Sequence, residues 1–161
     1  MTDKPFDVAV IGGGMITRDL LLPSLYQLQR DGWVADISVC ALNSTPLRDL
    51  AEDREIAEAF PGHTFQPFPS RQEDPQRLFP DLYKEVLSAQ KPYQAVIVAM
   101  PDHLHYPTVK EALNRNQHVL CVKPLVLHHA QAVEIEKLAR DKGLFVGIEY
   151  HKRFDRRALI A

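Results

Sequence analysis

The sequence has few of the residues that build disulfide scaffolds, metal centres or nucleic-acid surfaces. Its 161 residues include two cysteines, Cys40 and Cys121, and seven histidines without metal-ligand spacing, so we expect buried free thiols and no metal site. A net charge of −2 gives no electrostatic signature for nucleic acid or an acidic membrane. No apolar run approaches the roughly 18 residues needed to span a bilayer. Because the chain also starts with polar residues, we expect no secretory signal and a cytoplasmic location.

What the sequence does contain is an alternation of strand-like and helix-like segments. With 45% hydrophobic and 25% charged residues, the chain suits one globular domain with a real core. Predicted strands are the apolar run starting at Val8, then 35–42, a possible short strand at 64–68, 95–100, 118–122 and 144–149. Predicted helices follow the first strand to residue 31, then cover 46–60, 82–90, 108–114 and 130–142, with the proline-rich segment 61–80 as a long loop. This order predicts an α/β fold, a doubly wound and mostly parallel sheet of about six strands with helices on both faces.

The chain is organised around the turn that follows its first strand. The sequence V-A-V-I-G-G-G-M-I-T-R passes from an apolar run through three glycines into a helix, in the pattern Gly12-x-Gly14-x-x-Thr17. The first glycine allows a tight turn, and the second lets backbone approach a pyrophosphate. The helix start at Met15 and Ile16 presents free N–H groups to the phosphates. We therefore expect a dinucleotide at this turn.

The remaining unusual polar residues follow the other predicted strands. They are Asn43, the segment 100–105, Lys123 with Pro124, and the segment 150–153. In doubly wound sheets, ligands bind beyond the carboxyl ends of the strands. The sequence therefore predicts one site along this edge of the sheet.

Taken together, these segments resemble the Gfo/Idh/MocA family of NAD(P)-dependent oxidoreductases. The stretch M-P-D-H-L-H-Y-P at 100–107 is similar to the family's T-P-N-x-x-H-x-P, and C-V-K-P-L at 121–125 is similar to its E-K-P motif. The segment Y-H-K-R-F at 150–154 resembles the stretch ending in R-F that leads to a second domain. The resemblance covers essentially the whole chain and implies a Rossmann fold.

The resemblance implies hydride transfer between NAD or NADP and a sugar, cyclitol or related polyol. Lys123 would be the catalytic residue, a cation that stabilises developing alkoxide or relays a proton. The implied cofactor-binding residues are Gly12, Gly14, Met15, Ile16, Asn43, Met100, Pro101, His105, Lys123 and Pro124, with His105 shaping the nicotinamide pocket rather than donating a proton. Residues 1–150 would form the dinucleotide-binding domain, and 151–161 would begin the connection to a substrate and oligomerisation domain. The expected partners are the cofactor, a small substrate and further copies of the full-length protein, without nucleic acid or membrane.

Three residues depart from the family's pattern. Thr17 replaces the third glycine, which predicts looser packing of the helix on the strand. Asn43 stands where NAD-preferring relatives carry Asp or Glu, and Val122 stands in place of the Glu before the lysine. Two alternatives remain open: a dinucleotide-binding sensor or scaffold without turnover, which the substitution at 122 favours, and an enzyme that binds a nucleotide or methyl donor. The second would leave Lys123-Pro124 and the segment 101–107 unexplained.

Overall fold

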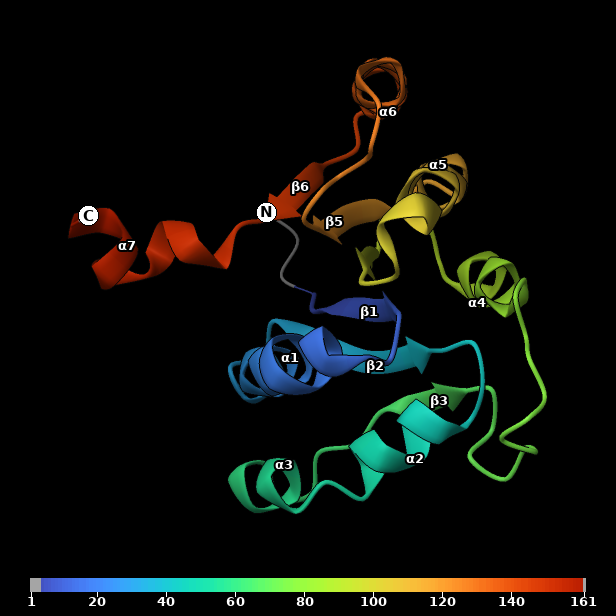
Figure 1. Cartoon of the computed structure of the whole chain (residues 1–161), viewed down its shortest axis with the longest axis vertical. Helices are drawn as coiled ribbons and strands as arrows, with labels where there is room; N and C mark the ends of the chain where they lie inside the picture. The colour runs from blue at the N-terminus through green and yellow to red at the C-terminus, as the bar shows by residue number, and fades with distance from the viewer. Residues whose placement is uncertain (1–3, 161) are drawn as a thin grey trace.

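The chain folds around six parallel strands, and the computed structural model describes residues 4–160. The strands are β1 (Phe6–Ile11), β2 (Val34–Cys40), β3 (Gln66–Phe68), β4 (Ala95–Val98), β5 (His118–Val122) and β6 (Val146–Glu149). Their spatial order is β3-β2-β1-β4-β5-β6, and every neighbouring pair is parallel (Figure 1). The order reverses between β1 and β4. In such sheets the ligand crevice lies at this switch point.

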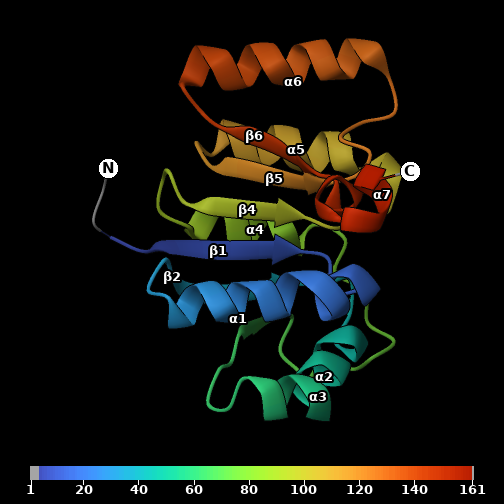
Figure 2. The same cartoon turned by 90° about the vertical axis from the view of Figure 1, so that its left-hand side faces the viewer.

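Helices cover both faces of the sheet. They are α1 (Leu22–Arg30), α2 (Thr45–Ala51), α3 (Arg54–Ala59), α4 (Leu82–Ala89), α5 (His105–Asn114), α6 (His129–Lys142) and α7 (Arg156–Ile160), with a π-helical turn η1 (Thr17–Leu21) before α1 and short 3₁₀ turns η2 (Asp102–Leu104) and η3 (His151–Phe154). Figure 2 shows the strands pointing the same way, with α1 lying across β1 and β2. The predicted Rossmann fold is confirmed.

The core is divided by the sheet into two apolar layers. Along β1 the side chains alternate, as strand geometry requires. Ala9 and Ile11 pack with α4, α5 and α6, whereas Val8 and Val10 pack with α1 and α2. All four are at most 4% exposed. Burial on both faces explains why this strand reads as a continuous apolar run.

Three expected elements differ in the structure. The helix predicted from Pro46 to Phe60 is two helices, because the chain breaks at Glu52 and restarts with Asp53 as the N-cap of α3. The Asp53 carboxylate accepts a hydrogen bond of 3.0 Å from the Ile56 N–H, which satisfies one of the donors that a helix start leaves free. The first helix contains the π-helical turn η1 immediately before Pro23, so the irregularity lies one turn earlier than the predicted bend. The helix predicted at 108–114 starts three residues sooner, at His105.

The C-terminal segment projects from the body of the domain (Figure 1). In η3 and α7 the apolar side chains Phe154, Leu159 and Ile160 are 86%, 67% and 81% exposed. The expectation that residues 151–161 connect to a second domain stays a prediction, and Ala161 lies outside the described residues. Among residues 4–160, none of the helices combines the length and apolar character needed to cross a bilayer.

Candidate dinucleotide-binding site

The turn after β1 requires glycine at its first position. Gly12 has a φ of 123°, a conformation that residues with a Cβ rarely adopt. A Cβ added there would lie 2.0 Å from the carbonyl oxygen of Ala99, the residue that follows β4. Gly12 therefore lets the ends of β1 and β4 approach each other at the switch point.

Gly14 has the opposite environment. A Cβ added at Gly14 would meet nothing within 4 Å, so the turn is open on the side where the sequence predicts a pyrophosphate. The Gly14 carbonyl accepts a 3.1 Å hydrogen bond from the Arg18 N–H, which marks the first turn of the helix. Within that turn Met15 is 71% exposed and Ile16 is half-buried. The N–H groups of a first helical turn have no carbonyl in front of them, which fits an anion at this position.

Thr17 strengthens the turn instead of loosening it. Its side chain is fully buried, and its hydroxyl donates a 2.6 Å hydrogen bond to the carbonyl oxygen of Gly12. The expectation of looser packing is wrong, because the hydroxyl finds a main-chain acceptor and the methyl group fills space among buried neighbours.

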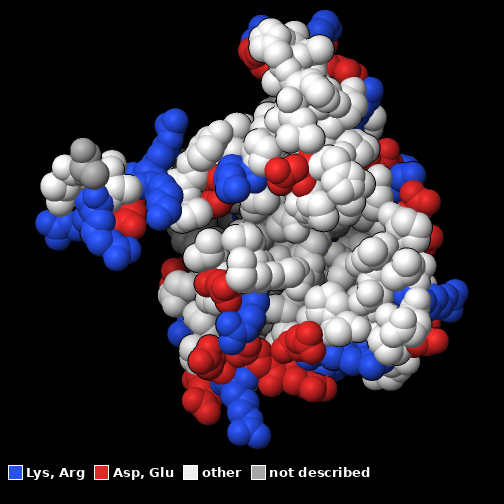
Figure 3. Space-filling view, in the orientation of Figure 1, with Lys and Arg blue, Asp and Glu red and all other residues white. Residues whose placement is uncertain are grey.

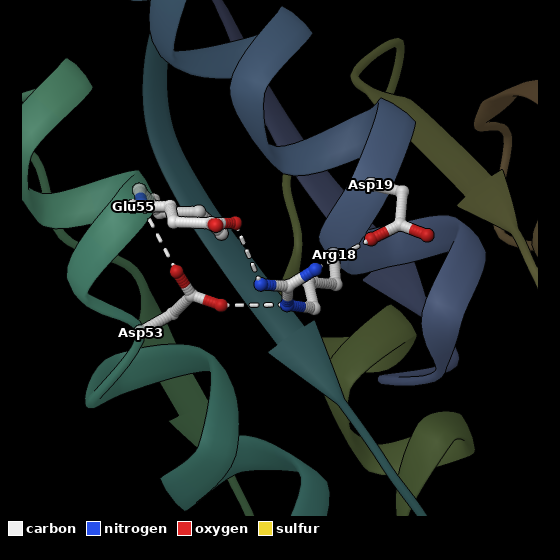
Figure 4. Close-up of polar contacts among 5 residues, drawn as sticks. Arg18, Asp19, Asp53 and Glu55 are labelled. Atoms are coloured by element: carbon white, nitrogen blue, oxygen red, sulfur yellow. Dashed lines mark hydrogen bonds and ion pairs between the residues drawn. The ribbon is translucent and has the colours of Figure 1, made fainter.

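Arg18 follows the glycine turn but points to α3, as Figure 4 shows. Its guanidinium pairs with Asp53 at 2.6 Å, Asp19 at 2.9 Å and Glu55 at 3.0 Å. Hydrogen bonds from the backbone N–H of Ile56, and then from Arg18, hold the pKa of Asp53 below its usual value. Arg18 is therefore committed to three carboxylates, and the groups offered to phosphates are main-chain N–H groups.

The end of β2 is held by the long loop 61–80. Asn43 is half-buried, and its side-chain oxygen accepts a 3.1 Å hydrogen bond from the Thr45 N–H. The buried Ser44 hydroxyl donates to the carbonyl of Glu73 at 2.8 Å. Arg48 donates to the carbonyls of Arg71 and Glu73 at 2.5 and 2.6 Å. Because carbonyls carry no charge, Arg48 keeps its full positive charge beside Asn43.

The segment after β4 is held in place by His105. Pro101 is exposed, Met100 is half-buried and His105 is completely buried. The ring nitrogens of His105 lie 2.7 Å from the Met100 carbonyl oxygen and 2.6 Å from the Pro124 carbonyl oxygen. The buried ring of His105 thus connects the segments that follow β4 and β5. Its predicted role in shaping the nicotinamide pocket would therefore be exerted through these two segments.

Lys123 stands at the carboxyl end of β5, and its side chain is exposed. The residue before it, Val122, belongs to the apolar core at 9% exposure. The Lys123–Pro124 peptide bond is cis, and the Pro124 carbonyl is the one that meets His105. The residue after the predicted catalytic lysine is therefore held through its carbonyl oxygen by the buried ring of His105.

The glycine turn and the segments that follow β2 and β4 border one cleft with a volume of about 570 Å³. Its walls come from the ends of β1, β2 and β4, the start of α5 and the loop before α4, and they include Gly12–Gly14, Ala41, Leu42, Phe79, Pro80, Met100, Pro101 and Thr108. Of the predicted site residues, Gly12, Gly14, Met100 and Pro101 line this cleft, together with Phe79 and Pro80, whose contribution was not foreseen. Its walls do not include the other predicted residues, which are Met15, Ile16, Asn43, His105, Lys123 and Pro124. In Figure 3 charged side chains gather along the lower and right-hand edges and on the projecting C-terminal segment, whereas the middle of this face is largely uncharged apart from a few charged side chains above its centre.

The two cysteines are both free and buried. Burial raises the pKa of each thiol to about 12, with smaller contributions from Glu85 on Cys40 and from Asp102 on Cys121. Thiols this weakly acidic are not nucleophiles at neutral pH. The prediction of buried free thiols is confirmed. Residues 4–160 contain no group of three or more His, Cys, Asp or Glu side chains placed to hold a metal ion.

Residues 6–150 match the family described as "Oxidoreductase family, NAD-binding Rossmann fold" (GFO_IDH_MocA). The chain belongs to this family. The expected cofactor, NAD or NADP, agrees with that description. The open glycine turn and the largely uncharged cleft fit such a molecule, since phosphates need main-chain donors and the rings need apolar walls.

The chain is similar to several oxidoreductases, some of them named and some uncharacterised. The chain is 30% identical over 154 residues to D-glucoside 3-dehydrogenase of Escherichia coli, covering 96% of this chain and 37% of that protein. A segment of 69 residues is 36% identical to an uncharacterised oxidoreductase of Schizosaccharomyces pombe, which is 43% of this chain and 19% of that one. The structure of KijD10, a 3-ketoreductase from Actinomadura kijaniata in complex with NADP and TDP-benzene, superposes with a TM-score of 0.69 at 22% identity, over 98% of this chain and 41% of that one. The chain spans less than half the length of these relatives.

Proposed function

We propose that this chain is the cofactor-binding part of an enzyme that transfers hydride between NAD(P) and a carbon of a sugar, cyclitol or related polyol. The observation that carries the proposal is the pair of contacts that the His105 ring makes with two main-chain carbonyl oxygens. The ring joins Met100, which lines the dinucleotide cleft, to Pro124, which follows the exposed Lys123. Lys123 follows β5 at the carboxyl edge of the sheet, the edge at which ligands bind in such folds, and this supports its proposed role.

Each residue then has a defined task. The main chain at Gly12–Ile16 binds phosphates, and the walls of the cleft exclude water from the rings. The bound nicotinamide supplies or accepts the hydride. Lys123 holds its charge toward the reacting oxygen, where a positioned cation stabilises negative charge as it develops. The name of one relative, D-glucoside 3-dehydrogenase, supports the substrate class.

The contacts at the end of β2 support tolerance of, or preference for, NADP. The Asn43 oxygen is occupied by the Thr45 N–H, so the side chain presents its amide donors outward instead of a carboxylate. Arg48 lies in α2, which starts two residues after Asn43, and the hydrogen bonds of its guanidinium go to main-chain carbonyls. A 2′-phosphate gains from both groups, whereas the adenosine ribose of NAD finds no carboxylate acceptor there.

The test uses titration with NADPH. We expect Lys123→Ala to weaken binding by about tenfold, the loss of one charge-assisted contact of roughly 1.4 kcal/mol. The matched control is Lys91→Ala, because Lys91 is an exposed lysine preceding β4 at the opposite edge of the sheet. Equal affinities of the two variants would remove Lys123 from the site.

A dinucleotide-binding sensor without turnover is the second candidate. Val122 favours it, because the residue before the lysine is an apolar core side chain and not a carboxylate. Absorbance of the reduced nicotinamide, followed with a panel of sugars and cyclitols in the chain and in any longer form of the protein, separates the two. Substrate-dependent change supports the enzyme, and tight binding without change in the longer form supports the sensor.

A further inference from the structure

The end of the loop 61–80 forms part of the wall of the dinucleotide cleft. Phe79 and Pro80 line this cleft, and Phe79 is half-buried. The Phe79 N–H donates a 2.8 Å hydrogen bond to the carbonyl oxygen of Leu42, the residue before Asn43. The loop thus attaches an aromatic side chain to the segment that follows β2.

The segment after β2 belongs to the adenosine end of the cleft. In dinucleotide-binding folds of this type, a side chain shortly after the second strand hydrogen-bonds the ribose of the adenosine half. Asn43 is the residue expected to take this place. Because Phe79 is hydrogen-bonded to the residue directly before Asn43, its ring lies at the end of the cleft that receives adenosine.

We propose that Phe79 is the wall on which the adenine base stacks, and that Ser44 is a positioning residue that holds Phe79 through the loop. The inference deepens the proposed function and rests on it for the dinucleotide. Adenine is flat and uncharged at neutral pH, and every nucleobase has a π-face that stacks on an aromatic side chain. Leu42 and Met100 line the same cleft and offer further apolar contact to a base.

Arg77 restrains the Phe79 ring. Its guanidinium carbon lies 4.8 Å from the centroid of that ring, within the range of a cation–π contact. The same guanidinium is 3.3 Å from the carboxylate of Glu73. A side chain that is already restrained loses less conformational freedom when a ligand binds to it, so these contacts prepare the ring for stacking.

Two side chains near the start of α2 hold the same stretch of the loop. The Ser44 hydroxyl donates a 2.8 Å hydrogen bond to the Glu73 carbonyl oxygen, and Arg48 donates to the carbonyls of Arg71 and Glu73. Glu73 therefore connects Ser44, through its carbonyl, to Arg77, through its carboxylate. Ser44 is completely buried, so its effect on a ligand in the cleft must act through the loop.

The direct test is an NMR titration of the isotope-labelled chain with ADP, which contains adenine and no nicotinamide. We expect nuclear Overhauser contacts between the adenine ring protons and the Phe79 ring, and an upfield ring-current shift of those adenine protons. The shift should be lost in Phe79→Leu, which keeps an apolar side chain without a π-face. The matched control is Leu78→Ala, because Leu78 is 59% exposed in the same loop and does not line the cleft. Absence of ADP binding, or binding without contact to the Phe79 ring, overturns the proposal.

Affinities measured by titration test the strength of stacking and the role of Ser44. Phe79→Ala should weaken ADP and NADPH by a similar factor of about tenfold, or ~1.4 kcal/mol, which is within the range for stacking of one base. Ser44→Ala should also weaken ADP, and its effect should largely disappear when Phe79 is already alanine, because the two residues then act as one unit. Unchanged ADP affinity in Phe79→Ala refutes stacking, and fully additive effects refute the positioning role of Ser44.

The outcomes distinguish this inference from the proposed function. The contact between ADP and Phe79 is independent of hydride transfer, because ADP has no nicotinamide. Binding of NADPH without any contribution from Phe79 refutes the inference alone. Stacking on Phe79 without substrate-dependent oxidation of NADPH in any longer form of the protein refutes the hydride-transfer function alone.

Discussion

Substitutions at two glycines of one turn should separate folding from cofactor binding. Gly12→Ala places a Cβ 2.0 Å from the Ala99 carbonyl oxygen at a φ of 123°. A residue in such a conformation costs about 1–3 kcal/mol before any clash is counted. Because the clash is with main chain, β1 and β4 must separate. We expect a loss of at least about 3 kcal/mol, or roughly 6–12 °C in Tm for a domain of this size.

Gly14→Val should have the reverse effect. A Cβ at this position meets nothing within 4 Å and requires no left-handed backbone, so the far-UV circular dichroism should be unchanged and Tm should stay within about 2 °C. The added side chain occupies the space predicted for the pyrophosphate and should abolish measurable dinucleotide binding. Valine is preferred to alanine here because its branches fill more of the open side of the turn.

The assay combines thermal melts with calorimetric titration of NADH and NADPH for each variant. A stable Gly14→Val protein with undiminished affinity would show that the phosphates lie elsewhere. A Gly12→Ala protein with unchanged Tm would show that β1 and β4 are not in close contact. Either result refutes the assignment of the turn.

Three further predictions concern preference, turnover and stability. Asn43→Asp should shift preference toward NAD by about tenfold or more, since a carboxylate repels a 2′-phosphate and accepts hydrogen bonds from a ribose; an unchanged ratio of Kd values would exclude residue 43. The 161-residue chain should show no turnover near the ~10 s⁻¹ typical of enzymes, because near-attack positioning worth roughly 7–11 kcal/mol needs a held substrate; turnover at that rate would show a complete site. Asp53→Ala should cost about 1 kcal/mol through loss of the α3 cap. Because the folded pKa of Asp53 lies below its ordinary value, this contribution is present above about pH 4 and is lost as the pH falls further; a Tm difference between the two proteins that persists at about pH 2 would contradict it.

Strands and the glycine turn were predictable because their causes are local. The runs at 95–98 and 118–122 are apolar on both faces, and a strand in a covered parallel sheet has this pattern. The glycine sequence specifies a turn by the backbone conformations that it permits, and Gly12 uses such a conformation. The ends of parallel strands share one edge, which is why residues 12, 43, 100 and 123 were expected together.

The break between α2 and α3 had a local signal that periodicity concealed. Ala51, Ile56 and Ala59 continue an apolar repeat across the break, and this repeat predicted one helix. Asp53 is the competing signal, since an aspartate preceding three helix-forming residues is a common N-cap. In the structure Asp53 caps α3 and also binds Arg18 of η1. The residue that divides the predicted single helix into two therefore also makes a tertiary contact.

Contacts of the loop 61–80 had no local signal at all. Ser44 and Arg48 bind main-chain carbonyls 23 to 29 residues away, and a carbonyl is present at every position of a sequence. The sequence therefore gives no indication that Ser44 and Arg48 are hydrogen-bonded to this loop. In the structure the Ser44 hydroxyl donates its hydrogen bond to the Glu73 carbonyl of the loop. Arg48 also binds carbonyls of the loop, but its positive charge is not neutralised by them.

His105 shows how a motif residue can be recognised correctly and its task still be incomplete. Sequence placed it beside the nicotinamide pocket as a residue that shapes the site. Its two acceptors belong to segments 24 residues apart in the chain, Met100 and Pro124, and only the fold brings them to opposite sides of one ring. The imidazole ring has a nitrogen on each side, so one buried side chain reaches both carbonyl oxygens. The choice of histidine is then explained by the two strand ends that it joins, which links the motif after β4 to the segment that carries Lys123.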